Sequence, residues 1–170
     1  MQFANPTLRG ALVAAAATAC ALSLPALAAN AAHADLGPAS GSAVSATVVV
    51  TPVAGGVHLE VKATGLSPGV HGFHVHEVGD CSAADASSAK GHFNPGATAH
   101  GMHAGDLPDL TADANGVARL SADVHGVELG DGITSILGRA FVIHADPDDH
   151  KSQPAGNAGK RIACGVIRAG

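Results

Sequence analysis

Residues 72–81 read GFHVHEVGDC, and this stretch predicts a short β-strand that ends in an acidic turn. On a strand, side chains two positions apart share a face, so His74 and His76 project together while Val75 points toward the core. Two imidazoles held side by side on a stiff strand pack poorly and are well placed to bind a metal ion. The pair alone is weak evidence, because histidines on a solvated strand face are ordinary.

Apolar residues recur at strand spacing through most of the chain. The predicted strands cover residues 46–50, 57–63, 72–77, 117–124, 138–145 and 161–167. Turn signals such as Asn115-Gly116 lie between them. No segment after residue 28 shows a sustained apolar repeat of 3.6 residues. The pattern therefore predicts an all-β fold.

The first 28 residues have the features of a secretory signal peptide: one positive charge at Arg9, an apolar run over 11–24, and small residues at the end. The run is too short, and breaks too early at Pro25, to predict a membrane span. Cleavage is predicted after Ala28. Lipidation of Cys20 is disfavoured because the better cleavage site lies downstream of it.

Cleavage at this point divides the chain into three parts. Residues 1–28 are the signal peptide, 29–42 are predicted to be a flexible Ala/Gly/Ser segment, and 43–170 form one domain. Removing Arg9 leaves 8 basic and 14 acidic residues, a formal net charge of −6. An acidic chain of this kind is an improbable partner for nucleic acid.

Cys81 and Cys164 are the cysteines that remain after cleavage. In an oxidising compartment two such residues usually pair. The disulfide would close a loop of roughly 80 residues, for which the chain-entropy model gives a stabilisation of about 4 to 5 kcal/mol.

Two segments without strand character, residues 78–109 and 146–160, are long enough to indicate functional loops. The first contains a group of potential zinc ligands: His92, His100, His103 and Asp106. Three ring nitrogens and one carboxylate oxygen can close the tetrahedral site that zinc prefers. An ion would order a loop that has little apolar surface to bury. The alternative is a solvated, mobile loop that carries histidines.

His144, in the stretch FVIHADPDD, ends a strongly apolar strand. Alone it indicates a strand-end histidine hydrogen-bonded to its neighbours, but it is also a candidate third ligand beside His74 and His76. Of the other histidines, His71 is expected to be structural. Four more are expected on the surface: His33, His58, His125 and His150.

Four motifs, in order, resemble those of the copper-zinc superoxide dismutases of the bacterial secreted or periplasmic type: GFHVHEVGD, GHFNP, HAGDLP and GNAGKRIACGVI. The resemblance covers roughly residues 43–169. It implies an eight-stranded Greek-key β-barrel, a flattened sandwich, with long metal-binding and electrostatic loops. It also implies a secreted or periplasmic location, no membrane span, and a homodimer as one possible assembly.

The resemblance assigns a role to each candidate residue. Copper would be bound by His74, His76, His92 and His144, and zinc by His92, His100, His103 and Asp106. Asp148 would hydrogen-bond His74 and His100 and orient both rings. Arg161 would lie beside the copper and bind the substrate anion. The Cys81–Cys164 disulfide would tie the metal-binding loop to the strand that carries Arg161.

The implied activity is the conversion of two superoxide radicals into dioxygen and hydrogen peroxide as copper alternates between Cu(II) and Cu(I). His92 would link proton movement to electron movement, and it is with Arg161 the predicted catalytic residue. Because the net negative charge repels superoxide, a local positive patch is expected, with Lys151 and Lys160 as further contributors.

Two other functions fit parts of the pattern. One is a copper/zinc-binding or copper-delivery protein that uses the same fold without catalysis; such relatives tend to lack a copper ligand or the arginine, and this chain has both. The other is a structural or adhesive sandwich with incidental histidines.

Overall fold

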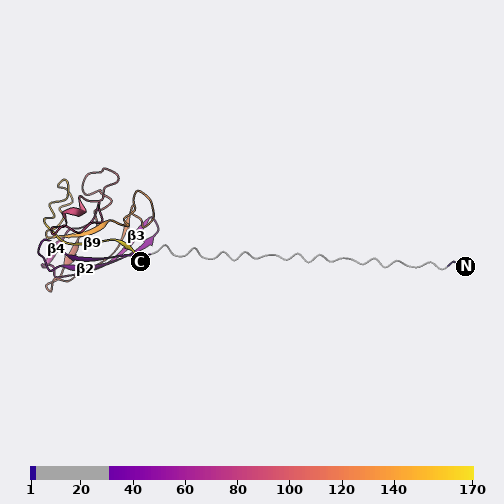
Figure 1. Ribbon diagram of the computed structural model, residues 1–170, viewed down its shortest axis with the longest axis horizontal. Helices are drawn as coiled ribbons and strands as arrows, with labels where there is room; N and C mark the ends of the chain where they lie inside the picture. Colours follow the sequence, from indigo (N-terminus) through magenta and orange to yellow (C-terminus); the bar gives the residue numbers. More distant parts are fainter. Residues whose placement is uncertain (3–30) are drawn as a thin grey trace.

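The computed structural model describes residues 1–2 and 31–170, and Figure 1 shows the strands gathered into one body. The predicted cleavage site and Cys20 lie outside the described residues. Within the described part of the chain there is one short 3₁₀ helix, η1 (Ser87–Ala89), and no helix has the length and apolar character needed to cross a membrane.

Within residues 31–170, ten strand segments make up nearly all of the regular structure. They are β1 (Ala32–Pro38), β2 (Ser45–Val53), β3 (Gly56–Thr64), β4 (Gly69–His71), β5 (Phe73–His76), β6 (Leu110–Ala112), β7 (Ala118–His125), β8 (Ala140–His144), β9 (Arg161–Val166) and β10 (Arg168–Ala169). Only Gly72 separates β4 from β5, and only Ile167 separates β9 from β10. Counted as continuous, these two pairs leave the eight strands that were predicted.

The sheet closes on itself through Gly72. Neighbouring strands follow the order β4-β6-β7-β3-β2-β1-β9-β8-β5, and every pairing is antiparallel. β4 and β5 stand at opposite ends of this order but are joined in the chain by one residue. The connection from β3 to β4 passes β7 and β6, which is a Greek-key arrangement. The prediction of an all-β barrel is therefore confirmed.

Alternation of buried and exposed residues explains why these segments form strands around one core. In β2, Val48 and Val50 are buried, whereas Val49 between them is 47% exposed. The Phe73 and Phe141 rings stack inside the barrel with their centroids 5.3 Å apart. Burial of such apolar surface is the main favourable contribution to folding.

The prediction of a flexible segment at residues 29–42 is wrong for residues 32–38, which form β1. This strand pairs with β2, β9 and β10. Ala32, Ala34 and Leu36 are buried while the residues between them are exposed. The period of two was present in the sequence, but two of the three inward residues are alanines, so the segment resembles a linker in composition. The very short strands β4, β6 and β10 were also missed.

The two long loops cover the outer face of β5 and β8. Phe73 and Val75 of β5 belong to the main core, so His74 and His76 point the other way, yet both are fully buried. A second apolar cluster lies on this outer side and includes Ala86 and Ala89 of the loop with Val142 of β8. The predicted Cys81–Cys164 disulfide is confirmed, with a Cα–Cα distance of 5.8 Å, and it fastens this loop to β9.

Candidate metal centre

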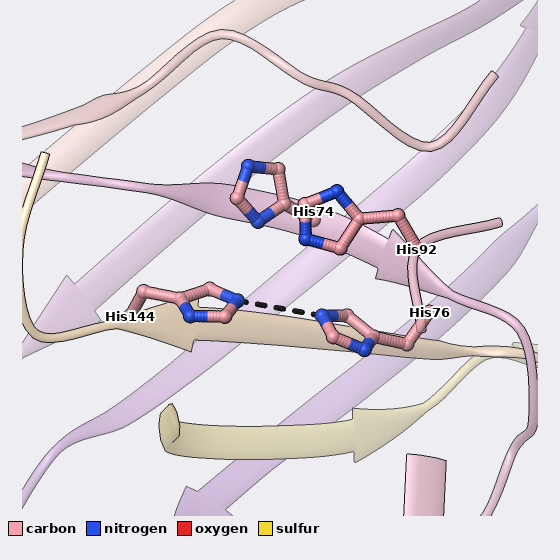
Figure 2. A group of neighbouring side chains, drawn as sticks. All are labelled: His74, His76, His92 and His144. Atoms are coloured by element: carbon pink, nitrogen blue, oxygen red, sulfur yellow. Dashed lines mark hydrogen bonds between the residues drawn. The ribbon is translucent and has the colours of Figure 1, made fainter. Parts of the chain in front are cut away.

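The first histidine group is built on two paired strands and one loop. His74 and His76 come from β5 and His144 from the end of β8, where a register shift between Ile143 and His144 re-aims the ring. Figure 2 shows the His76 and His144 rings meeting end to end, with 3.3 Å between their Nε2 atoms. The ring of His92 lies against that of His74, with the centroids 3.9 Å apart.

Backbone hydrogen bonds fix the position of His92. The next residue, Phe93, donates its N–H to Val75 O of β5 at 2.8 Å and accepts from Gly105 N at 2.8 Å. A Cβ at Gly105 would collide with Val75 O and lie 2.9 Å from Phe93 N. Only glycine permits this close approach, so the loop that carries His92 is held tightly against the strand that carries His74 and His76.

The second group surrounds one carboxylate oxygen. Asp106 Oδ1 lies 3.0 Å from His92 Nδ1, 3.3 Å from His100 Nδ1 and 3.2 Å from His103 Nδ1. The other carboxylate oxygen, Oδ2, accepts backbone N–H bonds from Gly101 and His103 at 2.8 and 3.0 Å. These bonds fix the carboxylate among the three rings. The ligand atoms of each group all lie within 4.8 Å of one another.

Several buried ring nitrogens that face these two groups have no hydrogen-bond partner among residues 31–170: His74 Nδ1, His92 Nε2, His100 Nδ1 and His103 Nδ1. Buried polar atoms are nearly always bonded, so converging partnerless nitrogens require an explanation. A cation between them supplies it. The first group offers only nitrogen donors, which suit copper, and the second offers three nitrogens and one oxygen, which suit zinc.

In His76 and His144, the ring nitrogen that faces away from the first group donates a hydrogen bond to a backbone carbonyl. The nitrogen that faces the group therefore keeps its lone pair. His76 Nδ1 donates to Lys90 O at 2.9 Å and His144 Nδ1 to Gly159 O at 3.3 Å. Both acceptors are backbone carbonyls, which every residue type carries, so no sequence signal marks them. His92 is different because one of its nitrogens faces each group.

Asp148 links the two groups from behind. Its fully buried carboxylate accepts from His74 Nε2 at 2.7 Å and from His100 Nε2 at 2.8 Å. Burial opposes the charged form, but the hydrogen bonds from His100, from the His150 backbone and from His74 lower the pKa of Asp148. An ionised carboxylate here makes both rings donate through Nε2 and leaves both Nδ1 atoms free.

Burial keeps three rings of the first group neutral, those of His74, His76 and His144. It lowers the pKa of His74 to about 4, of His76 to about 2 and of His144 to about 3, with neighbouring rings adding to the effect. Neutral imidazole is the form that binds metals. In the second group, burial raises the pKa of Asp106, but hydrogen bonds from His92 and from the His103 and Gly101 backbone outweigh it, so the net shift is downward.

Arg161 lies at the mouth of the first group. Its Nη1 and Nη2 donate to Ala86 O at 2.7 Å and to Lys90 O at 2.6 Å, so the loop fastened by the disulfide also holds the guanidinium. The cavity beside it measures about 310 Å³ and is lined by Arg161 with His76, His92 and His144, among others. A larger hollow of about 700 Å³ lies near Val53 and Leu137 and contains no histidine, so it lacks the chemistry of a metal site.

The structure thus brings together all the residues singled out for metal binding. Lys151 and Lys160 are exposed and do not line the cavity beside Arg161. His71 is buried, and its Nδ1 lies 2.9 Å from His144 O, as expected of a structural residue. The sequence did not indicate Gln153, whose side-chain oxygen accepts from His100 N at 2.9 Å and so steadies the second group.

Comparison with known proteins identifies the family. The model of the copper/zinc superoxide dismutase (SODC) family matches residues 44–167. The chain belongs to this family. It is 43% identical over 148 residues to superoxide dismutase [Cu-Zn] 2 of Aquifex aeolicus, covering 81% of this chain and 86% of that protein. The resemblance predicted from the four motifs is therefore confirmed.

Two further similar proteins show how far the likeness extends. Superoxide dismutase [Cu-Zn] of Caulobacter vibrioides is 41% identical over 133 residues, which is 71% of this chain and 76% of that protein. The crystal structure of a SOD-like protein from Bacillus subtilis has a TM-score of 0.73 at 36% identity and covers 78% of this chain and 95% of that one. Both sequence and fold therefore place the chain in the family.

Lowering the pH is expected to destabilise the metal-free protein between about pH 6.5 and 4. In this range the unfolded chain binds protons on His74, His76 and His144, whereas the folded chain, with its lowered pKa values, does not. Each ring contributes up to about 1.4 kcal/mol per pH unit. Urea unfolding at pH 7 and pH 5 measures the effect, and an unfolding free energy that stays constant would contradict it.

Replacing Asp148 with asparagine is expected to lower the affinity for at least one metal by about 10- to 100-fold. An amide has only one accepting oxygen, so either His74 or His100 must turn its lone pair outward and its N–H into the metal group. The matched control is Asp149→Asn, since Asp149 is an exposed carboxylate next to Asp148. Titration against chelators gives both affinities, and equal values for the two variants would contradict the role of Asp148.

Proposed function

We propose that the protein catalyses the disproportionation of superoxide into dioxygen and hydrogen peroxide. The observation that carries the proposal is the placement of His92, whose two ring nitrogens face two different groups of ligands. Its Nδ1 lies with His100, His103 and Asp106, and its Nε2 is left for His74, His76 and His144. A simple structural histidine has no need of two such groups.

In this proposal copper is held by His74, His76, His92 and His144, and zinc by His92, His100, His103 and Asp106. Copper supplies a one-electron couple, Cu(II)/Cu(I), that can oxidise one superoxide and reduce the next, whereas zinc has no redox chemistry and orders the loop. The donor sets fit this division. Asp148 keeps His74 and His100 in the tautomer that both ions require.

Arg161 binds the substrate anion. Guanidinium remains protonated throughout the physiological range and has five N–H donors, of which the two backbone carbonyls use only part. The donors that remain face a small cavity whose other lining residues include Gly91, Ala158 and Gly159. These small side chains leave room for a diatomic anion close to the rings, and the fixed positive charge favours its entry.

His92 supplies a proton to the product. Its Nε2 has no hydrogen-bond partner in the described part of the chain, and the residue lines the cavity beside Arg161. At a moment when it is not bound to copper, this atom can accept a proton and pass it to the peroxide that forms from the second superoxide. Since hydrogen peroxide carries two protons, the other is taken from solvent.

We also propose that the protein is exported to a bacterial periplasm or secreted, and that it forms a homodimer. The Cys81–Cys164 disulfide and the Caulobacter and Aquifex relatives support export. Fractionation of producing cells should find the mature chain outside the cytoplasm, and sedimentation should give twice the mass of one chain. A chain found in the cytoplasm would contradict export, and a chain that sediments as a monomer would contradict the homodimer.

The activity is tested by the decay of superoxide with protein loaded with both metals. We expect decay well above the spontaneous rate, and metal analysis near one copper and one zinc per chain. Arg161→Ala should keep both metals and lower the rate by about 10-fold or more, because the anion loses its positive partner.

His92→Ala should disturb both metal sites, because its ring contributes to both.

The control for His92→Ala is His125→Ala, since His125 is exposed on β7. This variant should match the unmodified protein in both metal content and rate. Full metal content without any acceleration of superoxide decay would instead favour the metal-binding or copper-delivery function. An unchanged copper site in His92→Ala would contradict the shared ring.

A further inference from the structure

A second polar cluster lies on the outside of the barrel, on β3 and β7. It consists of His58 and Glu60 of β3 with Ser121 and Asp123 of β7. The strand register sets His58 opposite Asp123 and Glu60 opposite Ser121. These positions alternate with buried core residues on β3 and with partly buried residues on β7, so the four side chains share the face that points to solvent.

Asp123 orients the His58 ring. Its Oδ1 lies 2.6 Å from His58 Nδ1. A carboxylate can only accept, so Nδ1 carries the hydrogen and the second nitrogen, Nε2, is directed away from Asp123. A carboxylate behind a histidine is the arrangement that usually supports a metal-bound ring, because it fixes the tautomer and makes the ring a better donor to a metal.

Three atoms converge on the other side of the ring. His58 Nε2 lies 3.0 Å from Glu60 Oε1 and 3.3 Å from Ser121 Oγ, and Ser121 Oγ lies 2.6 Å from Glu60 Oε1. With the hydrogen on Nδ1, Nε2 and the carboxylate oxygen face each other with lone pairs. Either a second proton or a metal cation must lie between them.

We propose that this cluster binds one divalent cation of the zinc type, at a site separate from the two buried histidine groups. His58 Nε2 and Glu60 Oε1 are the main ligands, Ser121 Oγ is the third, and water completes the shell. Zinc bonds of about 2.0 to 2.2 Å place neighbouring donors roughly 3.0 to 3.5 Å apart. The two distances from His58 already fall in this range, and only Glu60 and Ser121 must separate slightly.

The carboxylates nearest the ring favour a cation. Glu60 and Asp123 contribute two negative charges when His58 is neutral, whereas the next pair along the same face, Lys62 and Arg119, is positive and opposes a cation from farther away. Side-chain exposure is 31% for His58, 58% for Glu60 and 56% for Asp123, so an ion reaches the site directly from solvent. Hydrogen bonds to Glu60 and Asp123 raise the pKa of His58, so a proton competes with the cation for this position.

The test is a titration with Zn²⁺ at pH 8, where fewer protons compete, on protein whose buried groups already hold copper and zinc. Calorimetry should show one further saturable equivalent of zinc. His58→Gln should abolish it, and Asp123→Asn should weaken it by about 10-fold or more through loss of ring orientation. His125→Gln is the matched control, since His125 is exposed on the same face of β7, and it should bind as the unmodified protein does.

Nuclear magnetic resonance gives a second readout on the same samples. The ring signals of His58 should shift as zinc is added, and those of His125 should not. Absence of a further saturable equivalent would overturn the proposal, and so would unchanged binding in His58→Gln or equal loss in His125→Gln. None of these residues belongs to the buried metal groups, so the result does not depend on whether the protein removes superoxide.

Discussion

Buried histidine nitrogens that face one another without hydrogens between them are the constraint on which the structure depends. Four such nitrogens have no hydrogen-bond partner among the described residues. Burial also keeps the rings of His74, His76 and His144 neutral. In the absence of a cation these lone pairs are desolvated without compensation, which is costly. We infer two metal ions, one in each group, because His92 presents one nitrogen to each group.

The rest of the fold serves to hold these rings in place. The paired strands β5 and β8 fix His74, His76 and His144 on one stiff surface, whose inner face is anchored by the Phe73–Phe141 stack. The loop that carries the other ligands has little core of its own. It is held by the disulfide and by two hydrogen bonds from Arg161, so the group proposed to bind substrate also stabilises the loop. Stability and function are coupled at this arginine.

Part of the fold could be read directly from the sequence. Strands β2, β3, β5, β7, β8 and β9 could be predicted from apolar residues at strand spacing, and the Cys81–Cys164 pair follows from export. β1 was missed because alanines occupy two of its three inward positions, so burial there depends on the neighbouring strands and not on strongly apolar side chains. Closure of the barrel at Gly72 is a tertiary effect that no local pattern marks.

The site was predictable to a similar extent. His74 and His76 stand out by spacing, but the connection of His74 to His100 through Asp148 crosses more than seventy residues and came only from the resemblance to a family. The backbone acceptors Lys90 O and Gly159 O could not have been found, because a carbonyl group is independent of residue type. The cluster around His58 was read as ordinary surface, since its partners on β7 become visible only when the strands are paired.

The most direct test of the shared ring is magnetic. Protein with copper in the first group is titrated with Co²⁺, which replaces zinc in the second, while the Cu(II) signal is followed by electron paramagnetic resonance. Two paramagnetic ions bound to the two nitrogens of one imidazole couple to each other, so the account predicts that the copper signal disappears as cobalt fills its site. A copper signal that persists unchanged at full cobalt occupancy would show that His92 does not join the two ions.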